Sequence, residues 1–153
     1  PKPSSAASDV YKRQVLHIVD LRRALETEIA AQAAAVRKKR DMTEIDRALA
    51  AISQAVADGG DGVKEDVAFH RSIARATGNP YFLTTLAFVS QFLEAATRVT
   101  RGNEARHANL MRDVMQEHIA IVEAIRNQDV EGAREAARIH MVNAAKRLSQ
   151  AHR

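Results

Sequence analysis

Between Val15 and Gln150, apolar residues recur at intervals of three and four. This spacing places them on one face of an α-helix, whereas a β-strand would alternate at every second residue. Breaks that contain glycine or proline, such as those at 58–62 and 78–80, interrupt the pattern. Because short connections favour antiparallel neighbours, we predict an all-α fold, an antiparallel bundle of about six helices. The expected helices span about 15–37, 41–57, 63–77, 80–101, 104–126 and 130–150.

The composition fits a single soluble domain and excludes several kinds of site. With 153 residues, of which 46% are hydrophobic and 27% charged, the chain can build one core. It contains no cysteine, which excludes disulfides, thiolate metal sites and thiol nucleophiles. No apolar run approaches the roughly 20 residues that span a membrane, and no secretory signal is visible, so we expect a cytoplasmic protein. The net charge of +4 is scattered, and its densest cluster, at 37–40, suits a solvated helix end.

The first fourteen residues have a different character from the rest of the chain. They open with a turn-like Pro-Lys-Pro-Ser-Ser sequence, and no apolar periodicity emerges before Val15. We therefore expect residues 1–14 to form a disordered tail or to be a remnant foreign to the domain. The folded domain is expected to span residues 15–150.

Four polar residues occupy positions where the helical pattern calls for apolar ones. Asp66 and His70 lie one turn apart in the apolar row of the third expected helix, and His118 and His140 lie in those of the fifth and sixth. A buried polar group without a partner costs about 1–3 kcal/mol, so these side chains need partners. The other members of the three rows are Val63, Val67, Ile73, Ala74 and Thr77; Met111, Val114, Ile121 and Ile125; and Ala133, Ala137, Ala144 and Leu148.

Spacing indicates that the four residues share one layer of the bundle. The turn between the last two expected helices centres near Gln128, ten residues after His118 and twelve before His140. In an antiparallel hairpin both histidines then lie roughly 15–18 Å from the turn, at about 1.5 Å per residue. Asp66 and His70 lie at a comparable depth from the turn at Gly78. We therefore expect the four side chains to meet.

Three imidazoles and one carboxylate form a suitable site for a divalent metal. Zn²⁺, Ni²⁺, Mn²⁺ and Fe²⁺ all accept this ligand set, with Zn²⁺ or Ni²⁺ expected in purified protein. Coordination positions left open by Asp66, His70, His118 and His140 would be available to water or to a ligand oxygen. The alternative is that the polar residues are core groups that hydrogen-bond to one another, in a structural helical module without a metal.

Around these residues the chain resembles the FCD domain, the C-terminal effector-sensing domain of one large branch of GntR-type bacterial transcription regulators. The resemblance extends from about Val15 to Leu148, nearly the whole expected domain. The segments that carry it are Asp20–Glu26, Asp66–His70, Ala76–Pro80 and Glu117–Ile125, followed by Asp129, Ala133 and His140.

The resemblance implies a helical bundle with a central cavity and a divalent metal held by Asp66, His70, His118 and His140. It also implies a small organic acid as effector, a homodimer, and DNA binding through N-terminal winged helix-turn-helix domains. Such a domain would precede Val15, and the fourteen residues before that position are too few to contain it. DNA binding is therefore expected only through a part that this sequence lacks.

Three residues are candidate contacts to the acid. Arg22 borders the core row of the first expected helix and could bind a carboxylate through two hydrogen bonds, although an ion pair with Glu26, four residues on, is an equally good interpretation. Arg98 lies near the end of the fourth expected helix. Asn143 follows His140 by three residues and could face the same cavity, or else solvent.

Our first hypothesis is a metal-dependent sensing domain without catalytic activity. The alternative is a helical-bundle metalloenzyme that uses an open site of three histidines and one aspartate for hydrolysis or oxygen chemistry. Such an enzyme needs a general base beside the metal that is not itself a ligand. Glu117 adjoins His118 in sequence but is expected to point about 100° away around the helix.

Overall fold

The computed structural model describes residues 5–98 and 107–151 of the chain. All the regular elements in these ranges are α-helices, so the prediction of an all-α bundle is confirmed. The helices are α1 (Ser5–Val36), α2 (Lys39–Ala57), α3 (Val63–Ala76), α4 (Pro80–Gln91), α6 (Ala108–Arg126) and α7 (Val130–Ala151).

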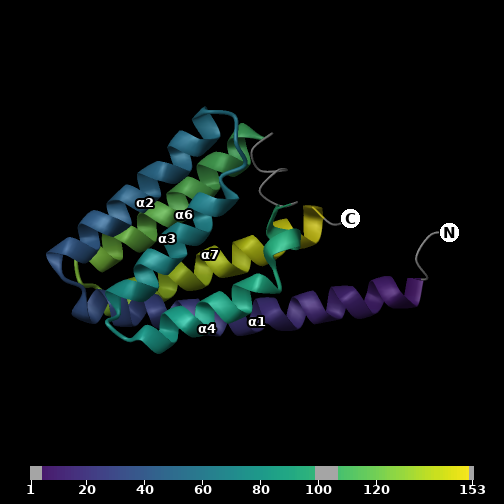
Figure 1. The fold of residues 1–153 in the computed structure, drawn as a ribbon, viewed down its shortest axis with the longest axis horizontal. Helices are drawn as coiled ribbons and strands as arrows, with labels where there is room; N and C mark the ends of the chain where they lie inside the picture. The colour runs from purple at the N-terminus through teal and green to yellow at the C-terminus, as the bar shows by residue number, and fades with distance from the viewer. Residues whose placement is uncertain (1–4, 99–106, 152–153) are drawn as a thin grey trace.

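The helices form two groups that cross each other (Figure 1). Helices α2, α3 and α6 lie together, and α1 runs alongside α7 with α4 packed beside it. The α6–α7 hairpin joins the two groups, because α6 belongs to the first and α7 to the second. Helix α3 contacts α1, α2 and α4, so side chains on α1, α3, α6 and α7 can converge in the middle of the bundle.

The first helix begins earlier than the sequence pattern predicts. Helix α1 begins at Ser5, so residues 5–14 are helical rather than a disordered tail, and Figure 1 shows them projecting beyond the other helices. Neither glycine nor proline interrupts the chain between Ser5 and Val36, and alanine favours the helix. Residues 9–14 bury no face, which explains why apolar periodicity gave no sign of this part of the helix.

The buried face of α1 agrees only in part with the sequence pattern, which placed one apolar face along Ile18, Leu21, Leu25, Ile29, Ala33 and Val36. Ile29 and Ala33 are buried, whereas Leu21 and Val36 are each 51% exposed. The buried side chains of α1 are Glu26, Ile29 and four alanines, Ala30, Ala31, Ala33 and Ala34. Small side chains on this face allow α7 to pack closely along α1.

Helix α4 ends earlier than the sequence pattern predicts. Helix α4 stops at Gln91, a turn follows at Phe92 and Leu93, and residues 94–98 are helical again. The expected continuation to 101 and the expected helix start at 104 lie outside the described residues, and α6 begins at Ala108.

The break between α3 and α4 follows the expected chemistry. Gly78 has φ of 69°, in the left-handed region that favours glycine after a helix end. The Asn79 side chain then accepts a hydrogen bond from the Tyr81 backbone N–H at 3.0 Å, and Pro80 occupies the first turn of α4. In the described part of the chain, no helix is long and apolar enough to cross a membrane.

Candidate metal centre

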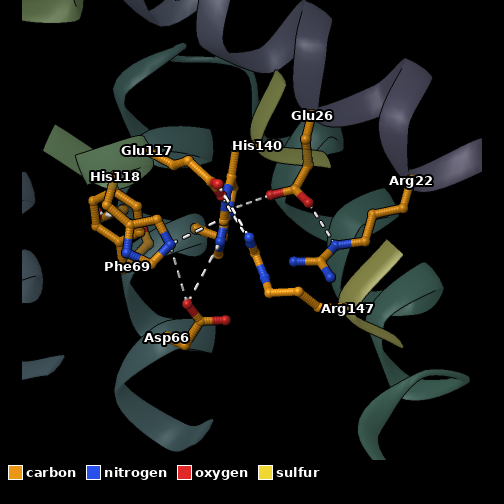
Figure 2. Close-up of polar contacts among 10 residues, drawn as sticks. Arg22, Glu26, Asp66, Phe69, Glu117, His118, His140 and Arg147 are labelled. Atoms are coloured by element: carbon orange, nitrogen blue, oxygen red, sulfur yellow. Dashed lines mark hydrogen bonds and ion pairs between the residues drawn. The ribbon is translucent and has the colours of Figure 1, made fainter. Parts of the chain in front are cut away.

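The structure brings the four polar residues of the apolar rows together in the middle of the bundle. Asp66 and His70 come from α3, His118 from α6 and His140 from α7, and all four are between 0% and 7% exposed. One ring nitrogen can be chosen from each of the three histidines so that all three lie within 4.8 Å of one another. Residue spacing predicted that the four side chains lie at a similar depth in the bundle, and the structure confirms this (Figure 2).

Short distances connect the three rings and the carboxylate. Nε2 of His118 lies 3.2 Å from Nε2 of His140 and 3.4 Å from Oδ1 of Asp66. The same carboxylate oxygen lies 3.8 Å from Nε2 of His70. These Nε2 atoms and the Asp66 oxygen thus lie around a common centre.

A carboxylate on α1 holds the outer side of the His70 ring. Oε1 of Glu26 lies 2.5 Å from Nδ1 of His70, and Oε2 accepts a 2.5 Å hydrogen bond from Nε of Arg22. Burial alone would raise the pKa of Glu26, but Arg22 and His70 outweigh this effect and lower the pKa to about 2. An ionised carboxylate can only accept a hydrogen bond, so Nδ1 of His70 carries the proton.

A second carboxylate, on α6, holds His140 in the same way. Oε1 of Glu117 lies 2.7 Å from Nδ1 of His140. Asn143 donates to Oε2 of Glu117 at 2.9 Å, and Arg147 donates to both oxygens, at 3.1 and 2.7 Å. Burial would raise the pKa of Glu117, but these hydrogen bonds lower the pKa to about 2. Nδ1 of His140 therefore also carries its proton.

These hydrogen bonds leave the Nε2 lone pairs of His70 and His140 directed at the centre. A neutral imidazole donates from one nitrogen and accepts at the other, and a proton fixed on Nδ1 makes Nε2 the electron-pair donor. Burial lowers the pKa of His140, and the hydrogen bond to Glu117 only partly offsets this, which favours the neutral ring. Nε2 of His70 is buried and makes no hydrogen bond.

The donor set fits a divalent transition metal. Neutral imidazole nitrogens and a carboxylate oxygen are ligands that Zn²⁺, Ni²⁺, Mn²⁺ and Fe²⁺ accept, and carboxylates behind the histidines are the usual support for such sites. Without a cation, two buried Nε2 atoms 3.2 Å apart would need a shared proton to avoid lone-pair repulsion. His70 Nε2 also lacks a hydrogen-bond partner, and a metal would satisfy it.

An apolar ring packs behind the histidines. Phe69, fully buried on α3, lies with its centroid 4.7 Å from that of His118 and 5.3 Å from that of His70. The His70 and His140 rings are stacked nearly parallel, 5.4 Å apart. These contacts restrict rotation of the rings and so fix the direction of their nitrogens.

A cleft of about 510 Å³ opens beside the centre, between α3 and the segment from α4 to residue 98. Asp66, His70 and Arg22 line its inner part. Burial would lower the pKa of Arg22, but Glu26 and Asp66 outweigh this and raise it, so this guanidinium is a charged group beside the centre. The ion pair of Arg22 with Glu26, one of its two interpretations, is present, and the arginine also borders the cleft.

The other two candidate effector contacts occupy different positions from Arg22. Arg98 lies at the outer part of the cleft, 58% exposed, with its guanidinium 3.4 Å from Glu94 and 3.6 Å from Asp61. The amide of Asn143 binds Glu117 instead, and Asn143 does not line this cleft. The structure therefore places Arg22 close to the centre, Arg98 at the margin and Asn143 behind His140.

Sequence reasoning did not identify Glu26, Glu117 and Arg147 as parts of the site. Glu26 had been considered only as a partner of Arg22, and Glu117 only as a group pointing away from the metal. The available signal was position: Arg147 lies seven residues after His140, two helical turns along the same face of α7. Glu117 precedes His118 by one residue and so faces α7 rather than α3.

Comparison with known proteins gives a consistent result. Residues 17–143 match the family description of the FCD domain. The HTH-type transcriptional repressor NanR of Klebsiella aerogenes is 32% identical over 127 residues, which cover 83% of this chain and 48% of NanR. NanR of Cronobacter sakazakii is 30% identical over 128 residues, with the same coverage. The chain thus spans about half the length of these curated relatives.

Two solved structures share the fold. Streptococcus agalactiae GntR superposes with a TM-score of 0.74 at 23% identity, over 89% of this chain and 60% of that protein. E. coli McbR/YncC superposes with a TM-score of 0.79 at 19% identity, over 93% of this chain and 67% of that protein. At this identity the likeness concerns the fold alone.

Proposed function

The chain belongs to the FCD domain family, and on that premise we propose that it is the metal-dependent effector-sensing part of a GntR-family transcription regulator. The effector we propose is a small organic acid. DNA binding would be carried out by another part of the regulator, and the sensing domain would work as a homodimer in the cytoplasm. The repressor NanR, which matches along about half its length, supports a role in transcription.

The observation that carries this proposal is the connection between the cleft and the buried donor cluster, by which we mean Asp66, His70, His118 and His140. Asp66 and His70 belong to both the cluster and the cleft lining, and Arg22 lies beside them. Asp66, His70, His118 and His140 would hold the metal, which would offer coordination positions to oxygen ligands. A carboxylate entering the cleft would meet this positive centre and the Arg22 guanidinium together, which favours acids over neutral molecules.

The signal would be a change in the balance between two domain arrangements. A ligand shifts such a balance only by as much as it binds one arrangement better than the other. The cleft is bordered by α3 on one side and by residues of α4 and 93–98 on the other, so an acid bridging them would favour one spacing of these segments. A regulator could couple this spacing to the placement of its DNA-binding part.

The geometry favours this sensor over the metalloenzyme. A general base must lie within reach of a metal-bound water and keep a free oxygen for its proton. Glu117, the base that the enzyme hypothesis would use, lies behind His140, and both its oxygens accept hydrogen bonds from His140, Asn143 or Arg147. From this position it would orient His140 as a metal ligand rather than activate water.

Metal content and acid binding test the proposal together. We expect protein purified without chelator to contain close to one divalent metal per chain, and His118→Ala to abolish it. His17→Ala, which removes an exposed histidine from α1, is the matched control and should keep the metal. In a thermal-shift assay, at least some members of a panel of hydroxy acids and sugar acids should raise the melting temperature of metal-loaded protein but not that of metal-free protein. Metal-free protein that binds acids equally well would contradict metal dependence, and failure of every acid on loaded protein would contradict the sensor.

A further inference from the structure

The cleft beside the donor cluster carries more positive charge than one carboxylate requires. Five cationic side chains line it, and only two acidic ones do, Asp66 at the centre and Glu94 at the margin. The cationic residues are Arg22, Lys64, Arg71, Arg75 and Arg98.

Three of these five cations have no counter-charge in the described structure. Arg22 is paired with Glu26, and Arg98 lies near Glu94 and Asp61. For Lys64, Arg71 and Arg75, by contrast, the part of the chain described here offers neither an ion pair nor a hydrogen bond. Arg71 is also half-buried, so part of this unpaired cationic side chain is held against the wall of the cleft.

The unpaired cations form a row along α3. Arg71 follows Lys64 by seven residues, and Arg75 follows Arg71 by four, so the three lie on one face of the helix. Arg75 lies five residues beyond His70, about 7.5 Å further along the helix axis at about 1.5 Å per residue. Arg71 and Arg75 therefore continue the cleft lining beyond His70, toward the C-terminal end of α3.

We infer that the effector carries a second anionic group, an oxyanion at the end remote from the metal, which Arg71 and Arg75 bind. This inference rests on the proposed function, because it takes the first carboxylate to lie at the donor cluster and Arg22. A guanidinium binds a carboxylate or a phosphate through parallel N–H···O bonds, and two guanidinium groups one turn apart suit either oxyanion. The preferred effector class is then a dicarboxylic acid or a phosphorylated sugar acid, not a simple monocarboxylate.

Three acids that share one carbon chain separate these possibilities. Gluconate has one carboxylate, glucarate has a carboxylate at each end, and 6-phosphogluconate has a carboxylate and a phosphate. Their dissociation constants would be measured by calorimetry on metal-loaded protein at fixed ionic strength, because screening changes the binding of charged ligands. The variant is Arg71→Met with Arg75→Met. The matched control is Arg40→Met, which removes a positive charge from an exposed position on α2 outside the cleft.

We expect the doubly anionic acids to bind at least about tenfold more tightly than gluconate. The Arg71/Arg75 variant should lose that advantage while keeping its metal and its affinity for gluconate. The better of glucarate and 6-phosphogluconate identifies the second group as carboxylate or phosphate. Equal affinity for all three acids, or equal weakening of all three by the variant, would overturn the inference and leave the sensor intact. Binding of none of the acids by loaded, folded protein would count against both.

Discussion

Glu117 and His140 form the hydrogen bond that determines which nitrogen of His140 faces the donor cluster. Oε1 of the carboxylate lies 2.7 Å from Nδ1 of the ring. The low pKa of Glu117, about 2, means that the carboxylate is ionised and accepts a hydrogen bond from the Nδ1–H group of the ring. Glu26 holds His70 through Nδ1 in the same way, at 2.5 Å. Two carboxylates from different helices thus direct two Nε2 atoms at one centre, which makes the tautomers a property of the fold.

Glu117→Gln should therefore weaken metal binding without removing a ligand. The amide carries no charge to hold the Nδ1 proton of His140, and loss of such a supporting carboxylate typically costs about 10–100-fold in metal affinity. Affinity would be measured by competition with a chromophoric chelator. Because Arg147 also loses its anion, the variant should unfold more easily, so circular dichroism must first establish that it is folded.

Two further variants separate the positioning role from general destabilisation. Asn143→Ala removes one neutral hydrogen bond to Glu117 and should reduce metal affinity much less than Glu117→Gln. Glu123→Gln alters an exposed carboxylate on the same helix and should leave the affinity unchanged. A Glu117→Gln protein with normal metal affinity would contradict the positioning role.

Glu26 should make stability depend on pH. Its pKa in the fold is about 2, below the usual value of 4.5, so the fold favours the ionised form. This stabilisation is fully present above the unfolded-state pKa near 4.5 and is lost as the pH falls toward 2. The difference in pKa corresponds to about 3 kcal/mol at neutral pH, as an order of magnitude.

Urea unfolding of metal-free protein at several pH values measures this contribution. Glu26→Gln should be less stable than the unmodified protein at pH 7. The difference in unfolding free energy between the two proteins should narrow between pH 5 and pH 3, because the Glu26 carboxylate of the unfolded chain becomes protonated there while that of the folded chain stays ionised. The exposed pair of Glu135 and Arg138 provides the control, because Glu135→Gln should change stability little at any of these pH values. If the difference in unfolding free energy between Glu26→Gln and the unmodified protein stays constant with pH, Glu26 acts through packing alone.

Periodicity was sufficient to predict the helices and the meeting of Asp66, His70, His118 and His140. A helix fixes which residues share a face, and two helices joined by a short turn fix which residues share a depth, so both properties follow from counting residues. The turn at Gly78 was predictable for a similar reason, because glycine, asparagine and proline each have a local backbone preference there.

Residue spacing did not predict the features that depend on contacts between helices. Residues 9–14 are helical without a buried face, and Leu21 is exposed because α7 packs against the alanine-rich side of α1. The role of Asn143 depends on the rotation of α6 against α7, which brings Glu117 next to α7. Neither the rotation of a helix nor the pairing of side chains on different helices is contained in the spacing of one segment.

Removal of the metal should lower stability, and lowering the pH should release the metal. Imidazole must be neutral to coordinate, so protons compete with the metal for His70, His118 and His140. We expect metal affinity to fall as the pH is lowered into the acid range. Chelation at pH 7.5 should lower the melting temperature, and adding back Zn²⁺ or Ni²⁺ should restore it. An unchanged melting temperature after verified metal removal would favour a core of hydrogen-bonded histidines without a metal.

Phe69→Ala should destabilise the protein and loosen the metal centre at the same time. Phe69 is fully buried and packs against the rings of His70 and His118. Removing a buried phenylalanine ring typically costs about 3–5 kcal/mol, and the cavity would allow both imidazoles to rotate. Ile52→Ala, a fully buried position on α2 that is remote in sequence from the four ligand candidates, should cost about 2–5 kcal/mol but leave metal affinity nearly unchanged. Urea unfolding and chelator competition on both variants would measure the two effects separately. Equal loss of metal affinity in both would mean that overall stability, not the packing of Phe69 against the histidines, controls the centre.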